Sequence, residues 1–113
     1  MAMTEMNYVS GGGISGYTNL YGTESSNPSY TLNTASYIGK PILVLLYTWA
    51  GSGTLSKTYC DGATCTGGTI TKIDNLTQSN AQVTGTYYNL VPSSSSCVIA
   101  QTNAPAISVY VAE

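Results

Sequence analysis

The three cysteines are the residues of this chain best suited to chemistry, and their spacing favours a structural role. Four residues separate Cys60 from Cys65, and Cys97 follows much later. Structural zinc needs four Cys or His ligands, and the chain has no histidine. A loop disulfide, or two thiols buried beneath a loop, is the favoured interpretation. Cys60–Cys65 is the candidate bridge, because the Asp61-Gly62 turn would bring the two Cα atoms within disulfide reach.

The carboxylates show no spacing that is typical of catalysis. Asp61 and Asp74 lie in the ordinary turn dipeptides Asp-Gly and Asp-Asn, and nothing in the sequence places them together. A glycosidase needs two facing carboxylates, and a calcium site needs several oxygen ligands. The absence of histidine excludes Ser-His-Asp and Cys-His arrangements. The sequence therefore predicts no catalytic residue, no metal site and no cofactor, and we expect a protein that is not an enzyme.

The charge content excludes partners that are recognised mainly through charge. The 113 residues include 3 lysines, no arginine and 5 acids, so the charged fraction is 7% and the net charge is −2. A typical soluble domain is about 25% charged. Nucleic-acid binding needs clustered basic residues, and Lys40, Lys57 and Lys72 are far apart in the sequence. The longest apolar run, residues 41–47, is about one third of a membrane span. We expect neither nucleic-acid binding nor membrane insertion.

Hydroxyl and amide side chains replace the missing charges. Thr, Ser, Gly and Asn make up 50 of the 113 residues, and ten tyrosines with one tryptophan supply the aromatic groups. Disorder is disfavoured, because 42% of the residues are hydrophobic and strand-forming residues are concentrated in short segments. A surface of this kind is solubilised by hydroxyls and amides or is partly covered by partner subunits.

Short β-type segments alternate with turn-forming clusters from residue 14 to residue 113. Residues 42–49 form a continuous apolar run, which predicts a central strand covered on both faces. Residues 107–111 alternate as expected for a strand with one buried face. The remaining strands are expected at 14–21, 30–33, 54–59, 69–73, 82–84 continuing to 86–90, and 97–100.

This spacing predicts an all-β fold, a single-domain β-sandwich of jelly-roll type with about eight short antiparallel strands. We expect residues 60–68 to form a loop and Asp74-Asn75 a turn, and only residues 75–80 to have any helical character. The expected core consists of Ile42, Val44, Leu46, Val83, Leu90, Val98, Ile99, Ile107, Val109 and Val111.

The segment before this domain, residues 1–13, is predicted to be a flexible N-terminal arm that ends in three glycines. It lacks the basic start and apolar stretch of a secretory signal, so we expect synthesis in the cytoplasm with reduced thiols. Met3, Met6, Tyr8 and Val9 are apolar side chains that a solvated tail would not need. They are candidate contacts with a neighbouring subunit. The alternative is that the arm is a terminal segment without a function.

The tyrosines have two interpretations. They replace phenylalanine in the core with their hydroxyls at its rim, or they anchor interfaces and stack on sugar rings. Tyr47 and Trp49 are assigned to the core. One of the adjacent pair Tyr87 and Tyr88 is expected to point outward, because successive strand residues face opposite sides. The candidate interface residues in the domain are Tyr17, Tyr21, Tyr87 and Tyr88.

Taken together, a start without a leader, a glycine hinge, a body rich in Ser, Thr, Asn, Gly and Tyr, and a strand near the C-terminus resemble small bacteriophage virion proteins. Tail-fibre tips, receptor-binding domains and capsid decoration proteins are of this type. The resemblance covers the whole chain and is compositional. It implies a structural role in a virion, through assembly with copies of itself, often as a trimer, and with other virion proteins. A surface glycan is a further partner of such tip domains.

Two other classes of function stay open on the sequence alone. One is a carbohydrate-binding β-sandwich module. The other is a subunit of a filament or pilus, whose arm would complete the sheet of a neighbour by strand addition.

Overall fold

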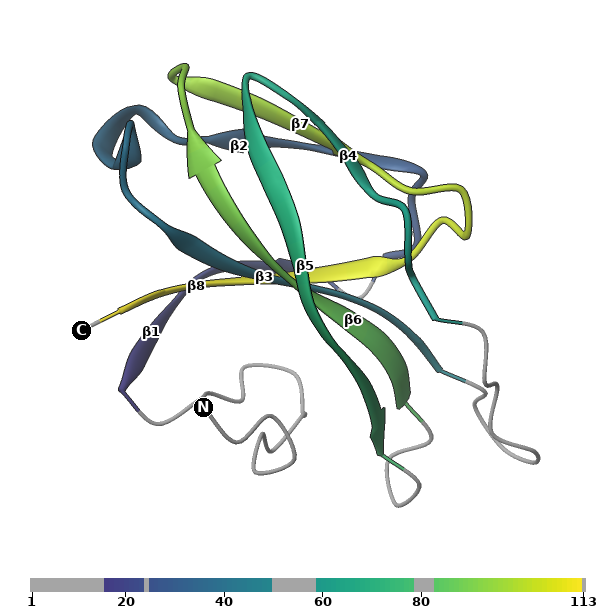
Figure 1. The fold of residues 1–113 in the computed structure, drawn as a ribbon. Coiled ribbons are helices and arrows are strands. Elements are labelled where there is room, and N and C mark those ends of the chain that lie inside the picture. The colour runs from purple at the N-terminus through teal and green to yellow at the C-terminus, as the bar shows by residue number, and fades with distance from the viewer. Residues whose placement is uncertain (1–15, 24, 50–58, 79–82, 113) are drawn as a thin grey trace.

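The computed structural model describes residues 16–23, 25–49, 59–78 and 83–112, which form two antiparallel sheets. The five-stranded sheet has the order β1-β8-β3-β6-β5, and the three-stranded sheet has the order β2-β7-β4. The smaller sheet lies across one face of the larger one (Figure 1). The strands are β1 Tyr17–Thr23, β2 Ser29–Asn33, β3 Ile42–Trp49, β4 Thr64–Thr66, β5 Gly68–Gln78, β6 Val83–Pro92, β7 Ser96–Ala100 and β8 Ala106–Ala112. The prediction of an all-β sandwich of about eight antiparallel strands is confirmed.

The strand pairs are nested along the chain. β1 pairs with β8, β2 with β7 and β3 with β6, all antiparallel. β4 is followed by β5 across the single residue Gly67. β8 also pairs with β3, and β5 with β6, which completes the larger sheet. The first and last strands are therefore neighbours, and the whole arrangement is that of one long hairpin folded into two sheets.

β3 is the central strand of the larger sheet because both of its faces are apolar. Alternate residues from Ile42 to Leu46 point between the sheets into a core formed with β2, β6, β7 and β8. The residues between them, from Leu43 to Tyr47, belong to a second apolar cluster on the other face. All of these side chains are buried, each contributing roughly 1.5–3 kcal/mol to folding. The predicted coverage of both faces is confirmed.

Eight of the ten predicted core side chains are buried. The exceptions, Val98 and Val111, are half-buried. Val98 alternates with the buried Cys97 and Ile99 along β7, so its side chain lies on the outer face of the smaller sheet. Val111 is close to the end of β8 and packs only partly against the core.

The segment around β4 and β5 differs from the prediction. Thr64–Thr66 form a strand instead of a loop, because they pair with residues 98–100 of β7. Some helical character was expected for residues 75–80, but residues 75–78 continue β5, and residues 79–80 lie outside the described part. Asp74-Asn75 lies inside this strand rather than in a turn. A bulge between Lys72 and Asp74 bends the strand there, which lets it continue through the polar pair. Pairing with β6 overrides the local turn and helix preferences.

The strand expected at 82–84 and continuing to 86–90 is β6, and its residues 83–90 are extended as predicted. Gly85 joins the two parts without an interruption, and a Cβ at this position would lie 2.8 Å from the carbonyl oxygen of Leu46. The glycine therefore marks a close approach of β3. The arm 1–13 lies outside the described residues, as does the expected strand 54–59 apart from Tyr59, which is not in a strand. In the described ranges, no helix is long and apolar enough to cross a membrane.

Candidate functional site

The edges of the sandwich differ in charge. Among the described residues, β1 and β2 are edge strands, and their sequences YTNLYGT and SYTLN contain no charged residue. At the other edges, β5 carries Lys72, Asp74 and a bulge, and β4 has only three residues. Charges, bulges and shortness are features that keep a sheet edge from pairing with another chain. β1 has a bulge at Leu20, but neither β1 nor β2 has a charge.

A groove of about 490 Å³ lies between the two uncharged edge strands. Leu20 and Tyr21 of β1 line it together with residues 31–34 at β2, and Tyr37 adds an aromatic wall from the short 3-10 helix η2, Ala35–Tyr37. Leu20 is 39% exposed and Tyr21 is 42% exposed. Ile38, directly after η2, is exposed as well. We call β1, β2, η2 and the groove between them the open side.

The predicted interface tyrosines divide between surface and core. Tyr21 is exposed on the open side, and Tyr17 is half-buried against the second apolar cluster. Tyr87 and Tyr88 point to opposite faces of the sheet, but both are buried, so the prediction that one of them is outward-facing is wrong. The physical reason is that the larger sheet has an apolar cluster on each face. Met3, Met6, Tyr8, Val9 and the side chain of Trp49 lie outside the described part.

The buried tyrosines act as the phenylalanines that the sequence lacks. Tyr47, Tyr87 and Tyr110 are among the largest fully buried side chains. Burial raises the pKa of Tyr87, Tyr88 and Tyr110 above the ordinary value of 10.0. These groups therefore remain neutral at physiological pH and serve packing and hydrogen bonding.

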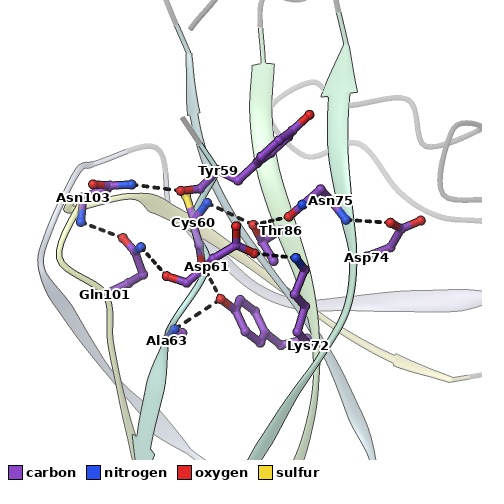
Figure 2. Close-up of polar contacts among 11 residues, drawn as sticks. Tyr59, Cys60, Asp61, Ala63, Lys72, Asp74, Asn75, Thr86, Gln101 and Asn103 are labelled. Atoms are coloured by element: carbon purple, nitrogen blue, oxygen red, sulfur yellow. Dashed lines mark hydrogen bonds and ion pairs between the residues drawn. The ribbon is translucent and has the colours of Figure 1, made fainter. Parts of the chain in front are cut away.

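On the edge opposite to the open side, a polar network holds residues 59–63 against β5 and β6 (Figure 2). Asp61 Oδ1 lies 2.7 Å from Lys72 Nζ, and its hydrogen bond raises the pKa of Lys72. In the orientation that satisfies both ends of its amide, Asn75 accepts from Lys72 Nζ at 3.1 Å and donates to Asp61 Oδ1 at 3.2 Å. Asp61 and Lys72 are both about half exposed, so this ion pair contributes little stability.

The main chain of the same loop is anchored to β6. The amide of Cys60 donates to Thr86 Oγ1 at 2.9 Å, and its carbonyl accepts from the hydroxyl of Tyr88. The Tyr88 oxygen also accepts from the amide of Ala63 at 3.2 Å. Thr86 and Tyr88 thus pair main-chain groups that would otherwise be unsatisfied.

Residues after β7 hold the other side of this loop. Gln101 Nε2 donates to the carbonyl of Asp61 at 2.9 Å, and Asn103 Nδ2 donates to the carbonyl of Tyr59 at 2.9 Å. Gln101 is buried, and its Oε1 accepts from the amide of Asn103. The contacts of Gln101 with Asp61 and of Asn103 with Tyr59 were not predicted from the sequence, because each joins residues 40 or more positions apart.

The two carboxylates of this edge have structural roles. Asp61 pairs with Lys72, and Asp74 Oδ1 accepts from the amide of the next residue, Asn75, at 2.8 Å. In the part of the chain that the structure describes, no three His, Cys, Asp or Glu side chains are grouped to hold a metal ion. The network positions a loop, and its charges discourage strand pairing at this edge.

The three cysteines are free thiols. Cys60 and Cys97 are buried, and Cys65 is half-buried. Cys65 lies on β4 beside strand β7, which carries Cys97, and the thiol that affects its pKa is that of Cys97 rather than that of Cys60, its predicted partner. Burial raises the pKa of Cys60 to about 11 and, together with the contact to Cys97, raises the pKa of Cys65 to about 11.

Comparison with known proteins found no match, so the function is argued from the geometry of the structure. No family model matches the chain, and no curated protein and no solved structure matches it. The two features that distinguish the surface are the uncharged open side and the charged, anchored edge opposite to it.

Proposed function

We propose that this protein is a non-enzymatic structural subunit of a virus particle, of the phage capsid decoration or tail-fibre type, that acts through contacts between subunits. The open side carries this proposal, because two uncharged edge strands flank a groove where Leu20 and Tyr21 are exposed. An edge strand that lacks charged residues is more open to pairing with another chain. The nested pairs β1–β8, β2–β7 and β3–β6 also suit a jelly-roll, an architecture that viral capsid domains use.

The partner that we assign to the open side is a second copy of this chain. β1 offers seven residues with mostly exposed side chains, and the absence of charge removes repulsion between identical strands. A symmetric contact would use the same surface on both copies, whereas a contact with a different surface would generate a ring such as a trimer. Other virion proteins would then contact the assembled unit.

Sedimentation of the purified chain tests this assignment, with two matched variants. Leu20→Lys places a charge at the bulge of β1, where the side chain is exposed and lines the groove. Ile73→Lys places the same charge at the bulge of β5, where Ile73 is 47% exposed. We expect the wild type and Ile73→Lys to associate, and Leu20→Lys to be mostly monomeric.

The proposal fails if the wild type is a monomer at high concentration and binds no particle. It also fails if both lysine variants associate as the wild type does, because the open side is then not the contact. Open-ended polymers in negative-stain images would indicate a filament subunit rather than a closed assembly.

A carbohydrate-binding module is the second candidate, favoured by the groove lining. Tyr21 and Tyr37 line the groove beside the polar side chains of Asn33 and Ser36. Aromatic faces that stack on sugar rings, with amides and hydroxyls beside them, are typical of such sites. A glycan array separates the two candidates: binding that Tyr37→Ala abolishes, in a protein that stays monomeric, would favour the module.

A further inference from the structure

Two of the thiols lie on neighbouring strands and face the same side. β4 and β7 are antiparallel, with Cys65 opposite Ile99 and Thr66 opposite Val98. Cys97 is two residues from Ile99, so the side chains of Cys65 and Cys97 are diagonal neighbours on one face of the smaller sheet. Both pack at the core between the sheets, and the interaction with Cys97 contributes to the raised pKa of Cys65.

The surroundings of the two thiols differ in a way that gives each a separate role. Cys65 is half-buried, and its Sγ lies 3.7 Å from the carbonyl oxygen of Thr66. Cys97 is fully buried; its Sγ donates to the carbonyl of Gly67 at 3.0 Å and lies 3.3 Å from Thr34 Oγ1. A reagent from solvent therefore meets Cys65 first, and Cys97 is the buried thiol on the neighbouring strand.

We propose that Cys65 and Cys97 are a dithiol site that forms an intramolecular disulfide by exchange with a small-molecule disulfide such as oxidised glutathione. The Cys65 thiolate attacks one sulfur of the reagent, which forms a mixed disulfide and releases one small thiol. Cys97 loses its proton to solvent, and its thiolate attacks Cys65 Sγ, which releases the second small thiol. The protein loses two hydrogens, and the two electrons reduce the reagent to two thiols.

The bond would fix the shortest strand of the smaller sheet. β4 has only three residues and lies at the edge of its sheet among the described residues. A covalent link from Cys65 to Cys97 closes a loop that contains all of β5 and β6. Closing a loop of this length restricts the unfolded chain, so we expect the melting temperature to rise by roughly 10 °C.

The reaction should be slow at neutral pH and should accelerate in base. Only the thiolate attacks, and the burial that raises the pKa of Cys65 to about 11 leaves little of it at pH 7. The rate should rise about tenfold for each pH unit below that pKa.

Peptide mapping without reduction tests the proposal on the full chain. The folded wild type is incubated with oxidised glutathione at pH 8.5, alkylated and digested. Before alkylation, we expect the intact mass to fall by about 2 Da. After digestion, we expect a peptide in which Cys65 and Cys97 are cross-linked. Cys60 should be alkylated only after the protein is unfolded. Cys60→Ala should form the same cross-link, and Cys65→Ser should form none.

Three results would overturn the proposal: a Cys60–Cys65 peptide, a link between two chains, or a mixed disulfide on Cys65 that Cys97 never resolves. Circular dichroism recorded during the oxidation is the control that the protein stays folded while it reacts. If Cys65→Ser does not fold, the proposal is tested on the wild type alone. The test is then its peptide map, together with the melting temperatures of the oxidised and reduced protein. These readouts do not depend on assembly, so the proposed function and this site are tested separately.

Discussion

Hydroxyl groups at single positions satisfy buried main-chain groups in this protein, a role that the few charged residues cannot fill. The Tyr88 hydroxyl bridges the Cys60 carbonyl and the Ala63 amide. Thr34 Oγ1 donates to the carbonyl of Ser94 at 2.7 Å, and the Tyr30 hydroxyl donates to the carbonyl of Pro105 at 2.7 Å. A buried polar group left without a partner costs about 1–3 kcal/mol. At these positions a hydroxyl is required, and phenylalanine or valine would not serve.

Removing the bridging hydroxyl of Tyr88 should therefore destabilise the fold. Tyr88→Phe keeps the ring in the core but leaves the Cys60 carbonyl and the Ala63 amide unpaired, so the free energy of unfolding should fall by about 1–3 kcal/mol. Tyr37→Phe is the control, because the Tyr37 side chain is half-buried and its hydroxyl has no hydrogen bond to the described residues. Urea unfolding measures both. Equal effects of the two substitutions would contradict the bridging role of Tyr88.

The thiols predict a loss of stability in base. Cys60 and Cys65 have pKa values near 11 in the folded chain, against an ordinary value of 9.0. Between pH 9 and pH 11 the unfolded state therefore binds fewer protons than the native state, and the free energy of unfolding falls as the pH rises. Below pH 9 the contribution is fully present. Urea unfolding with a reductant at pH 8, 9, 10 and 11 should show the fall.

A Cys60→Ala, Cys65→Ser double variant is the control for this pH dependence. Its stability should change less than that of the wild type between pH 9 and pH 10. An unchanged slope would assign the alkaline loss to other groups, such as the buried tyrosines.

At the scale of elements, strands with an apolar or alternating residue pattern could be predicted from the sequence. Strands that depend on pairing with a distant strand could not. The apolar run 42–49 has the bounds of β3, and β2, β7 and β8 lie within about one residue of their predicted positions. Local turn preferences were misleading at Asp74-Asn75, where a bulge and pairing with β6 keep the chain extended. β4 is too short to show a pattern of its own and exists because β7 pairs with it.

Gly67, between β4 and β5, is the position where a single methyl group should do most harm. Its φ is +92°, and a Cβ there would collide with the carbonyl oxygen of Ser96. Gly67→Ala should therefore cost at least about 3 kcal/mol. Gly62→Ala is the matched control, since Gly62 has a φ of +77° but nothing within 4 Å of a Cβ. That substitution should cost about 1 kcal/mol. Thermal unfolding of both variants measures the difference, and equal costs would contradict the collision.

For the whole molecule, the candidate site is defined by where charges are missing. Of the four described charged residues, Asp61, Lys72 and Asp74 gather at the β5 edge, and only Lys40 lies elsewhere. The sequence predicted a weakly charged surface and named Tyr21 as an interface residue. It could not show which edges lack charge, because strand order depends on pairings between distant segments. For the same reason it did not reveal that Cys65 and Cys97 lie on neighbouring strands.

The arm, residues 1–13, supplies the last prediction for the assembled protein. It lies outside the described residues, and the chain that follows it enters β1, the uncharged edge strand of the open side. Its apolar residues Met3, Met6, Tyr8 and Val9 could therefore reach the open side of a neighbouring copy across the glycine hinge.

Deleting residues 2–10 should leave the melting temperature nearly unchanged, because the sandwich core is built from β1 to β8. The same deletion should shift sedimentation toward the monomer. Replacing Met3, Met6, Tyr8 and Val9 by serine, with the length of the arm kept, is the control that separates lost contacts from lost length. A deletion that unfolds the sandwich would show that the arm is part of the core. If assembly survives the deletion, the edges of β1 and β2 are the contact between copies. The arm is then a terminal segment with no role in assembly.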